Sequence, residues 1–219
     1  MALLINNAGI ASNFGSGFSD DGLIEAGREE VEVNVFGPFA LTQSFAPVLA
    51  KNGGGGVVNV LSVVGLVSFP SAITYSASKA AAHSITQATR SHLRAQGTYV
   101  AGAYPGPVDT DMGKNIPMEK ASLESVSLAI LKGIGAGVED ILPDVGSVEM
   151  GKAFFADPKA LERRVGARGG RGCVSPGGRV ANLARASKTV MPDQGLASSE
   201  ARLVELRRHR EPLHGLVRD

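Results

Sequence analysis

Short apolar runs alternate with longer stretches of helical pattern along this chain, and that alternation restricts its fold more than any other feature. Val57–Ser62 is a β-branched run without a charged residue, as expected of a strand buried on both faces of a sheet. Thr98–Tyr104 is a second such run, and a helix-length, alanine-rich stretch lies between the two. Strands and helices that alternate in this way favour an α/β fold with a parallel sheet and helices on both of its faces.

The same patterns predict the other elements. Further strands and helices are expected at Ala2–Ile5, Leu23–Ala50, Tyr75–Gln96, Ser122–Ile134, Ile141–Pro143 and Val148–Arg164. Gly37 and Pro38 fall inside the first of these helices, so we expect a kink or a break there. Glycine-rich loops are expected at Gly15–Gly22 and Asn52–Gly56.

Composition excludes several classes of protein. The 219 residues are 43% apolar and 20% charged, with a net charge of +1, which suits a globular domain and argues against a nucleic-acid binder. The single Cys173 excludes an intrachain disulfide and fits a reducing cytosol. The sequence has no run of about 18 apolar residues. It also lacks a basic leader followed by an apolar stretch, so we expect a cytoplasmic protein without a membrane span.

The composition changes near residue 165. Residues 166–219 hold ten Lys or Arg against five Asp or Glu, with many glycines and few periodic apolar positions. We expect a folded domain over residues 1–165 and a disordered, basic tail over residues 166–219. Two alternatives are an RGG-type RNA contact at Ala167–Gly172 and an out-of-frame translation of GC-rich DNA. Sequencing the source gene for a frame slip near residue 165 would test the second alternative.

A tyrosine and a lysine four residues apart, Tyr75 and Lys79, share one face of an expected helix. An ammonium beside a phenol favours the phenolate, so we expect the pKa of Tyr75 to lie below its ordinary value. Such a phenol can exchange a proton with a substrate oxygen near neutral pH. Ser62 ends the preceding strand, at the sheet edge where ligands bind in parallel folds. Asn34 precedes the expected helix interruption, where free backbone groups leave room for water.

Taken in order, several short motifs resemble those of the short-chain dehydrogenase/reductase family. They are an Asn-Asn-Ala-Gly sequence, an Asn–Ser–Tyr–Lys tetrad with Tyr-x-x-x-Lys spacing, and a Pro-Gly pair followed by Val and Thr. These motifs stand at Asn6–Gly9, Asn34, Ser62, Tyr75, Lys79 and Pro105–Thr110. The resemblance covers residues 1–165. It implies a Rossmann-like, doubly wound parallel sheet, NAD or NADP as the cofactor, and a small alcohol or carbonyl compound as the substrate.

The resemblance also implies a role for each residue. Tyr75 would be the general acid in carbonyl reduction and the base in alcohol oxidation, and Lys79 would lower its pKa and hold the nicotinamide ribose. Ser62 would hydrogen-bond the substrate oxygen. Asn34 would hold a water that links Lys79 to solvent. Cofactor contacts are implied for Asn7, Ala8, Gly9, Tyr75, Lys79, Pro105, Gly106, Val108 and Thr110.

One part of the family pattern is missing. The family opens with a strand, a Thr-Gly-x-x-x-Gly-x-Gly turn that holds the cofactor pyrophosphate, and a helix, whereas this sequence starts at the Asn-Asn-Ala-Gly motif. Gly15–Gly22 cannot replace the turn because it lacks the spacing and a surrounding βαβ unit, and Gly53–Gly56 cannot because it precedes a strand. The region that separates NAD from NADP is absent as well.

From this departure we expect an N-terminally truncated family member with a partial sheet. The strand at Ala2–Asn6 would leave an unpaired edge. Such a chain would be marginally stable, prone to aggregation and nearly inactive. The alternative function is a non-catalytic fragment or decayed product that retains the tetrad.

Four other patterns in the sequence carry weaker signals. Ser76-x-x-Lys79 matches the S-x-x-K motif of penicillin-interacting enzymes, but the companion motifs are absent. His83 and His92 have no Glu or Cys at ligand spacing, so no metal is expected. Four alanines of the Tyr75 helix permit close packing, and the resemblance implies a homo-oligomer through this helix and the Asn34 helix. Asp111–Ser122 is expected to cover the substrate as an apolar lid.

Overall fold

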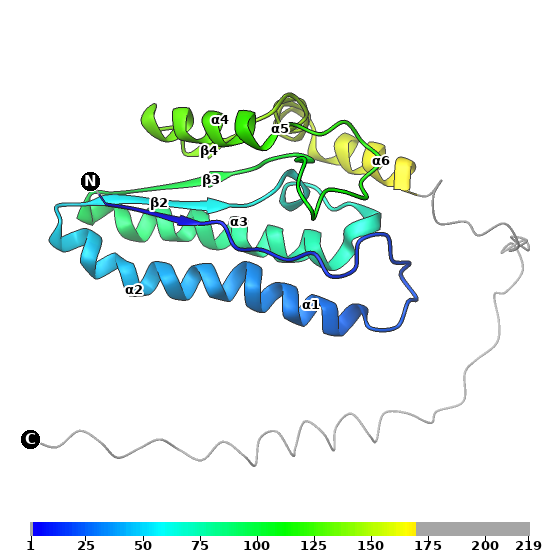
Figure 1. Cartoon of the computed structure of the whole chain (residues 1–219), viewed down its shortest axis with the longest axis horizontal. Helices are drawn as coiled ribbons and strands as arrows, with labels where there is room; N and C mark the ends of the chain where they lie inside the picture. Colours follow the sequence, from blue (N-terminus) through cyan, green and yellow to red (C-terminus); the bar gives the residue numbers. More distant parts are fainter. Residues whose placement is uncertain (1, 170–219) are drawn as a thin grey trace, which may run out of the picture. The chain divides into compact units, whose positions relative to one another are not determined.

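The computed structural model describes residues 2–169 as a parallel sheet between two layers of helices (Figure 1). The strands are β1 Ala2–Asn6, β2 Gly55–Val60, β3 Thr98–Ala103 and β4 Asp140–Ile141. The α-helices are α1 Leu23–Val31, α2 Gly37–Lys51, α3 Ile73–Leu93, α4 Leu123–Gly135, α5 Val145–Ala156 and α6 Pro158–Gly169. A π-helical turn at Glu32–Phe36 and 3₁₀ turns at Val63–Gly65, Pro70–Ala72 and Arg94–Gln96 complete the set. The predicted α/β class is confirmed.

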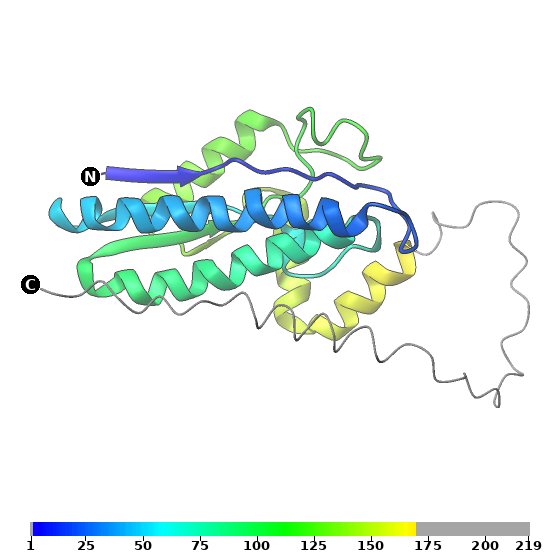
Figure 2. The ribbon, with the colours of Figure 1, turned by 90° about the horizontal axis from the view of Figure 1, so that it is seen from below.

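The strands lie in the order β1-β2-β3-β4, and every neighbouring pair is parallel. Helices α1, α2 and α3 cover one face of the sheet, and α4, α5 and α6 lie on the other (Figures 1 and 2). Because successive side chains of a strand point to opposite faces, β2 serves two cores. Val57 packs with Leu49 and Val100 on one side, and Val58 packs with Ala101 and Ile141 on the other. This double burial explains why the strand is apolar without interruption.

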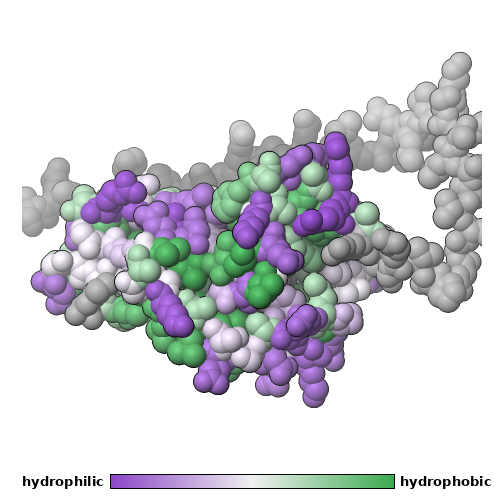
Figure 3. Space-filling view, turned by 90° about the horizontal axis from the view of Figure 1, so that it is seen from above, coloured by the Kyte–Doolittle hydropathy of each residue, from purple (hydrophilic) through white to green (hydrophobic). Residues whose placement is uncertain are grey.

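The sheet begins at an edge, since β1 pairs with β2 alone among the described residues. Leu4 points toward α2 and packs in the cluster of Leu49 and Val57. Leu3 and Ile5 point the other way and are 41% and 44% exposed. Apolar surface gathers in the middle of the face opposite α2 and α3 (Figure 3). The expected open edge is therefore present in the described part of the chain.

The helix expected at Leu23–Ala50 runs without a break from Leu23 to Lys51. The interruption predicted at Gly37 and Pro38 is a π-helical turn just before them, in which the Gly37 amide donates to the Glu32 carbonyl. The helix does not break there, because the widened turn accommodates Pro38, which has no N–H to donate. By length and a mean hydropathy of 1.2 over 18 residues, this helix would also pass as a membrane span. Core helices pass the same test, and this helix contacts the sheet and α3.

Several expected boundaries differ from the structure, among them the last strand, expected at Ile141–Pro143 and present at Asp140–Ile141. The single helix predicted at Val148–Arg164 is two helices, because Asp157 precedes a proline and is extended, with φ −157°. Gly55 belongs to β2 rather than to a loop, and a Cβ there would lie 2.6 Å from the Ala2 carbonyl oxygen, so glycine lets the strands meet. Helix α6 continues to Gly169, past the predicted start of the tail. The remainder of the tail, Cys173 included, lies outside the described residues.

Candidate active site

The carboxyl ends of β2 and β3 supply the first part of the site. Ser62 follows β2 and caps the 3₁₀ turn Val63–Gly65, with its hydroxyl 3.4 Å from the Val64 amide nitrogen. The same hydroxyl donates to the carbonyl of Pro105, which follows β3, at 3.3 Å. A Cβ on Gly65 would lie 2.8 Å from the Lys79 carbonyl oxygen, so only glycine lets this turn approach α3 so closely. The turn therefore sets Ser62 beside the first two turns of α3.

Lys79 extends from α3 to the end of the sheet. Its side chain is buried, and its ammonium donates to the Val60 carbonyl at 3.0 Å. The Nζ atom lies 5.7 Å from the ring centroid of Tyr75. Burial lowers the pKa of Lys79 to about 8, so it keeps its charge at neutral pH. An ammonium has three N–H donors, so two remain for a ligand.

Tyr75 stands in the first turn of α3, and its phenol does not behave as expected. Burial raises its pKa to about 12, hydrogen bonding with Ser62 lowers it, and the charge of Glu30 raises it. The expectation of a lowered pKa was wrong for the chain by itself, because desolvation of the phenolate outweighs its neighbours. At neutral pH the phenol therefore holds its proton, which is the form that can donate one.

Asn34 lies in the π-helical turn and is 2% exposed. Its Oδ1 accepts from the Ile10 amide at 2.8 Å, and its Nδ2 donates to the Ile10 carbonyl at 2.9 Å and to Ser78 Oγ at 3.0 Å. These bonds use both N–H donors of the side chain and one of the two lone pairs of Oδ1. Asn34 therefore joins the loop after β1 to α3. A water held by this residue would bind the other lone pair of Oδ1 or the backbone carbonyl, whose counterpart four residues on is Pro38 and has no N–H.

The residues predicted to contact a cofactor fall into two groups. Gly9 is at the tetrad, since a Cβ there would lie 3.2 Å from Asn34 Oδ1 and 3.3 Å from Lys79 Nζ. Pro105 is bonded to Ser62, and the Gly106 amide donates to Asp144 at 2.9 Å. Asn7, Ala8, Val108 and Thr110 lie on the loops that follow β1 and β3, and Asn7, Ala8 and Thr110 are exposed. The structure thus brings Gly9 and Pro105 together with the tetrad.

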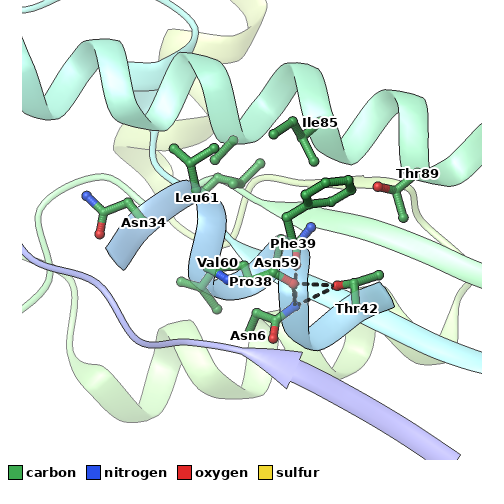
Figure 4. Close-up of a pocket in the computed structure, with 12 residues that line it drawn as sticks. Asn6, Asn34, Pro38, Phe39, Thr42, Asn59, Val60, Leu61, Ile85 and Thr89 are labelled. Carbon is green, nitrogen blue, oxygen red and sulfur yellow. Dashed lines mark hydrogen bonds between the residues drawn. The ribbon is translucent and has the colours of Figure 1, made fainter. Parts of the chain in front are cut away.

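Polar side chains support the sheet beneath this site. Asn6 Nδ2 donates to Asn59 Oδ1 at 2.8 Å and lies 3.2 Å from Thr42 Oγ1 (Figure 4). Asn59 in turn donates to Thr86 at 2.9 Å. All four are buried, so the network ties β1 and β2 to α2 and α3. One turn beyond Lys79 on α3, His83 Nδ1 lies 2.7 Å from the Tyr104 hydroxyl, which satisfies that nitrogen.

Sequence reasoning missed two residues of the site. Phe14 packs on Tyr75, with ring centroids 6.5 Å apart. Glu30 is fully buried, and its Oε1 accepts from the Ser12 amide at 2.7 Å. Phe14 stands in a loop, where no periodic pattern of apolar residues identifies it. Glu30 could have been suspected, since it lies four residues before Asn34 and therefore on the same helix face.

We predict that Lys79 gives the fold a distinct pH dependence. The unfolded chain keeps the Lys79 proton up to its ordinary pKa of 10.5, whereas the folded chain releases it near 8. The unfolded state binds more protons in that window, so the free energy of unfolding should rise by about 3 kcal/mol from pH 8 to 10.5. Tyr75, raised from 10.0 to about 12, begins to oppose the rise above pH 10.

Denaturant titrations at a series of pH values would measure this rise. Lys79→Met should flatten it, and Lys51→Met, at an exposed position, should leave it unchanged. An equal slope in wild type and Lys79→Met would contradict the assignment.

A parallel α/β sheet with a partly buried tyrosine and a buried lysine and serine at its carboxyl edge is typical of Rossmann-like oxidoreductases, and comparison with known proteins agrees. The family model described as short chain dehydrogenase matches residues 1–121. The chain is 37% identical over 110 residues to an uncharacterized oxidoreductase, YusZ, of Bacillus subtilis, covering 50% of this chain and 38% of that protein.

Two solved structures are also similar. A short chain dehydrogenase from Burkholderia cenocepacia in complex with NADP has a TM-score of 0.70 and 36% identity, over 75% of this chain and 68% of that one. A 7α-hydroxysteroid dehydrogenase with NADH has a TM-score of 0.55 and 26% identity, over 62% and 58%. The chain belongs to the short-chain dehydrogenase/reductase family. It spans 34% to 49% of the length of the curated relatives it matches.

Proposed function

We propose that this chain carries the acid–base half of an NAD(P)-dependent oxidoreductase that interconverts a small alcohol and its ketone or aldehyde. The observation that carries the proposal is the meeting of Ser62, Tyr75 and Lys79 at the carboxyl edge of the sheet. Family membership and relatives that bind NADP or NADH support it. The substrate beyond this class is left open, and a cytoplasmic location is part of the proposal.

In reduction, the nicotinamide cofactor supplies the hydride that adds to the carbonyl carbon. Ser62 holds the carbonyl oxygen by a hydrogen bond, and Tyr75 gives that oxygen its phenolic proton, so that an alcohol results. The charge on Lys79 stabilises the phenolate left behind. Asn34 holds the loop that contains Gly9 against α3 through its hydrogen bonds to Ile10 and Ser78. Oxidation is the reverse, with Tyr75 as the base.

The residues fit the nicotinamide–ribose part of the cofactor. Lys79 has free donors for ribose hydroxyls, and Gly9 leaves a space that a Cβ would fill beside the ammonium. The loop after β1 suits a pyrophosphate poorly, because the Gly17 amide is already bonded to the Asp20 carboxylate at 2.7 Å. The expectation that no βαβ unit surrounds Gly15–Gly22 was wrong, because β1, the Leu23–Lys51 helix and β2 form such a unit. The loop remains too long for a phosphate turn.

We further propose that the 219-residue chain alone turns over slowly, since its sheet edge is open. Titration of the chain with NAD and with NADP by calorimetry, followed by assays on alcohols and ketones, tests both proposals. Weak binding with slow turnover abolished by Tyr75→Phe supports them. Micromolar binding with full turnover would overturn the proposed slow turnover. No binding and no turnover would favour the alternative, a non-catalytic fragment that retains the tetrad.

We also propose that the chain forms a homo-oligomer through the Leu23–Lys51 helix and α3. Several large apolar side chains of the first helix are exposed, and they are Phe36, Phe39, Leu41, Phe45 and Val48. An exposed apolar surface of this kind marks a protein contact. Sedimentation velocity should show a larger species for wild type than for Phe45→Glu. The same distribution for both chains would contradict this interface.

A further inference from the structure

Glu30 is a buried charged residue that the proposed mechanism does not use. Its side chain is fully buried within the described structure. Oε1 accepts the Ser12 amide at 2.7 Å, and Oε2 has no partner among the described residues. Burying a carboxylate with one free oxygen destabilises a fold relative to burying an apolar side chain. A fold keeps such a group most readily where it serves the site beside it.

The packing of the helices places Glu30 beside the reactive tyrosine. At one contact between α1 and α3, a Cβ on Gly27 would lie 3.1 Å from the Thr74 side chain. At the next, Asn34 donates to Ser78 at 3.0 Å. Glu30 lies between Gly27 and Asn34 on the same helix face, and so at the level of Tyr75 on α3.

The loop joined to Glu30 also reaches Tyr75. Three backbone amides of this loop donate hydrogen bonds to the surrounding structure. The Ile10 amide donates to the Asn34 side chain, and the Ser12 amide donates to the Glu30 side chain. The Gly15 amide donates to the Ser71 carbonyl at 2.7 Å. Phe14, between the last two anchors, packs on the Tyr75 ring. The loop Ile10–Gly15 therefore forms a wall of the site that is fastened at three points, and Glu30 supplies the middle one.

We propose that Glu30 is a positioning residue of the acid–base site: it anchors the loop Ile10–Gly15 through Ser12, and its buried negative charge favours the protonated, proton-donating form of Tyr75. This inference rests on the proposed role of Tyr75. Two charged groups face the phenol, the Lys79 ammonium on its own helix and the Glu30 carboxylate on α1, together with the neutral Ser62 and Phe14. They act in opposite directions, because the cation favours the phenolate and the anion opposes it. Glu30 thus opposes the ionisation of Tyr75 that Lys79 favours.

The test is the ionisation of Tyr75 in the full chain without cofactor. The sequence has three tyrosines and no tryptophan, so the ring signals of ¹³C-labelled tyrosine can be assigned with a Tyr75→Phe variant. Glu30→Gln keeps an oxygen for the Ser12 amide but removes the charge. It should move the Tyr75 titration to lower pH by about one pH unit. Glu29→Gln removes the same charge at an exposed neighbouring position and should not move it.

A second variant separates the two parts of the proposal. Glu30→Ala also removes the anchor, so the Ser12 amide should exchange with solvent at least tenfold faster than in Glu30→Gln. If Glu30 has only a structural role, its substitution changes the exchange of the Ser12 amide and the stability of the fold. The Tyr75 titration in Glu30→Gln would then coincide with that of wild type, and such a coincidence would overturn the proposal. If Glu30→Gln does not fold, a measurement on the wild-type chain still tests the proposal. The Glu30 carboxyl carbon signal should respond as Tyr75 ionises, the response should vanish in Tyr75→Phe, and a flat signal in wild type overturns the proposal.

These measurements need no turnover, so the two proposals can fail separately. An inactive chain with a shifted Tyr75 titration would refute the oxidoreductase proposal and leave the Glu30–Tyr75 coupling standing. An active chain whose Tyr75 titration ignores Glu30 would do the opposite.

Discussion

Replacing Tyr75 by phenylalanine is expected to lower the turnover number of carbonyl reduction by about a thousandfold, the usual range for loss of a general acid. The ring would stay against Phe14, so the loop contact and the fold should survive. Only the hydroxyl that gives its proton to the substrate oxygen would be lost. The phenol is neutral at pH 7 in both the folded and the unfolded chain, so its raised pKa has no effect on stability at that pH, and the free energy of unfolding should change by less than about 1 kcal/mol.

Steady-state reduction of a ketone at neutral pH would measure this loss, with thermal unfolding run in parallel. Tyr99→Phe is the matched control, since it removes the same atom from a hydroxyl that bonds the Val138 carbonyl, away from the site. That variant should keep its turnover. If Tyr75→Phe keeps more than a tenth of the wild-type rate, another group donates the proton and the proposed mechanism fails.

A lysine placed at Leu4 is expected to unfold the chain, whereas a lysine placed at Leu3 is expected to keep it folded and reduce its aggregation. Leu4 is partly buried against Leu49 and Val57, so a lysine there would lose this packing and part of its hydration, at a cost of about 2 kcal/mol. Leu3 is 41% exposed on the opposite face of the same edge strand. A charge on an exposed edge strand discourages pairing with a second chain.

Circular dichroism and light scattering on the two variants would measure both effects. The substitutions are identical and the positions adjacent, so the comparison isolates the face of β1 that each side chain occupies. Equal loss of structure in both variants would mean that Leu3 is buried in solution. Unchanged scattering for Leu3→Lys would mean that β1 is not the aggregating edge.

Much of the fold could be read from the sequence, because its signals are local. The β-branched run of β2 and the alanine-rich α3 form where their patterns predict. The meeting of Ser62, Tyr75 and Lys79 could also be predicted, since parallel strands deliver their carboxyl ends to one edge. The break at Asp157 was missed although an X-Pro pair signals it.

The electrostatics of the site could not be predicted in the same way. The Tyr-x-x-x-Lys spacing shows that a phenol and an ammonium share a face, but not how deeply either is buried. Burial decides the direction in which the pKa of Tyr75 moves. Glu30 was missed for a related reason, because an acidic residue among the charged neighbours of α1 has the pattern of a solvated face. Its burial depends on the close approach of Gly27 to Thr74 in a distant helix.

The π-helical turn at Glu32–Phe36 lies within one continuous helix. Glu30 faces α3 before the turn, Asn34 faces α3 from within it, and after it Thr42 meets the Asn6–Asn59 pair. A π-helical turn holds one residue more than the corresponding α-helical turn, so the helix beyond it keeps its direction and its phase. Removing one residue from the turn would therefore restore a uniform α-helix and leave Thr42 on the sheet. The loss would fall on Asn34, which the widened turn carries, and so on the loop after β1 that Asn34 holds against α3.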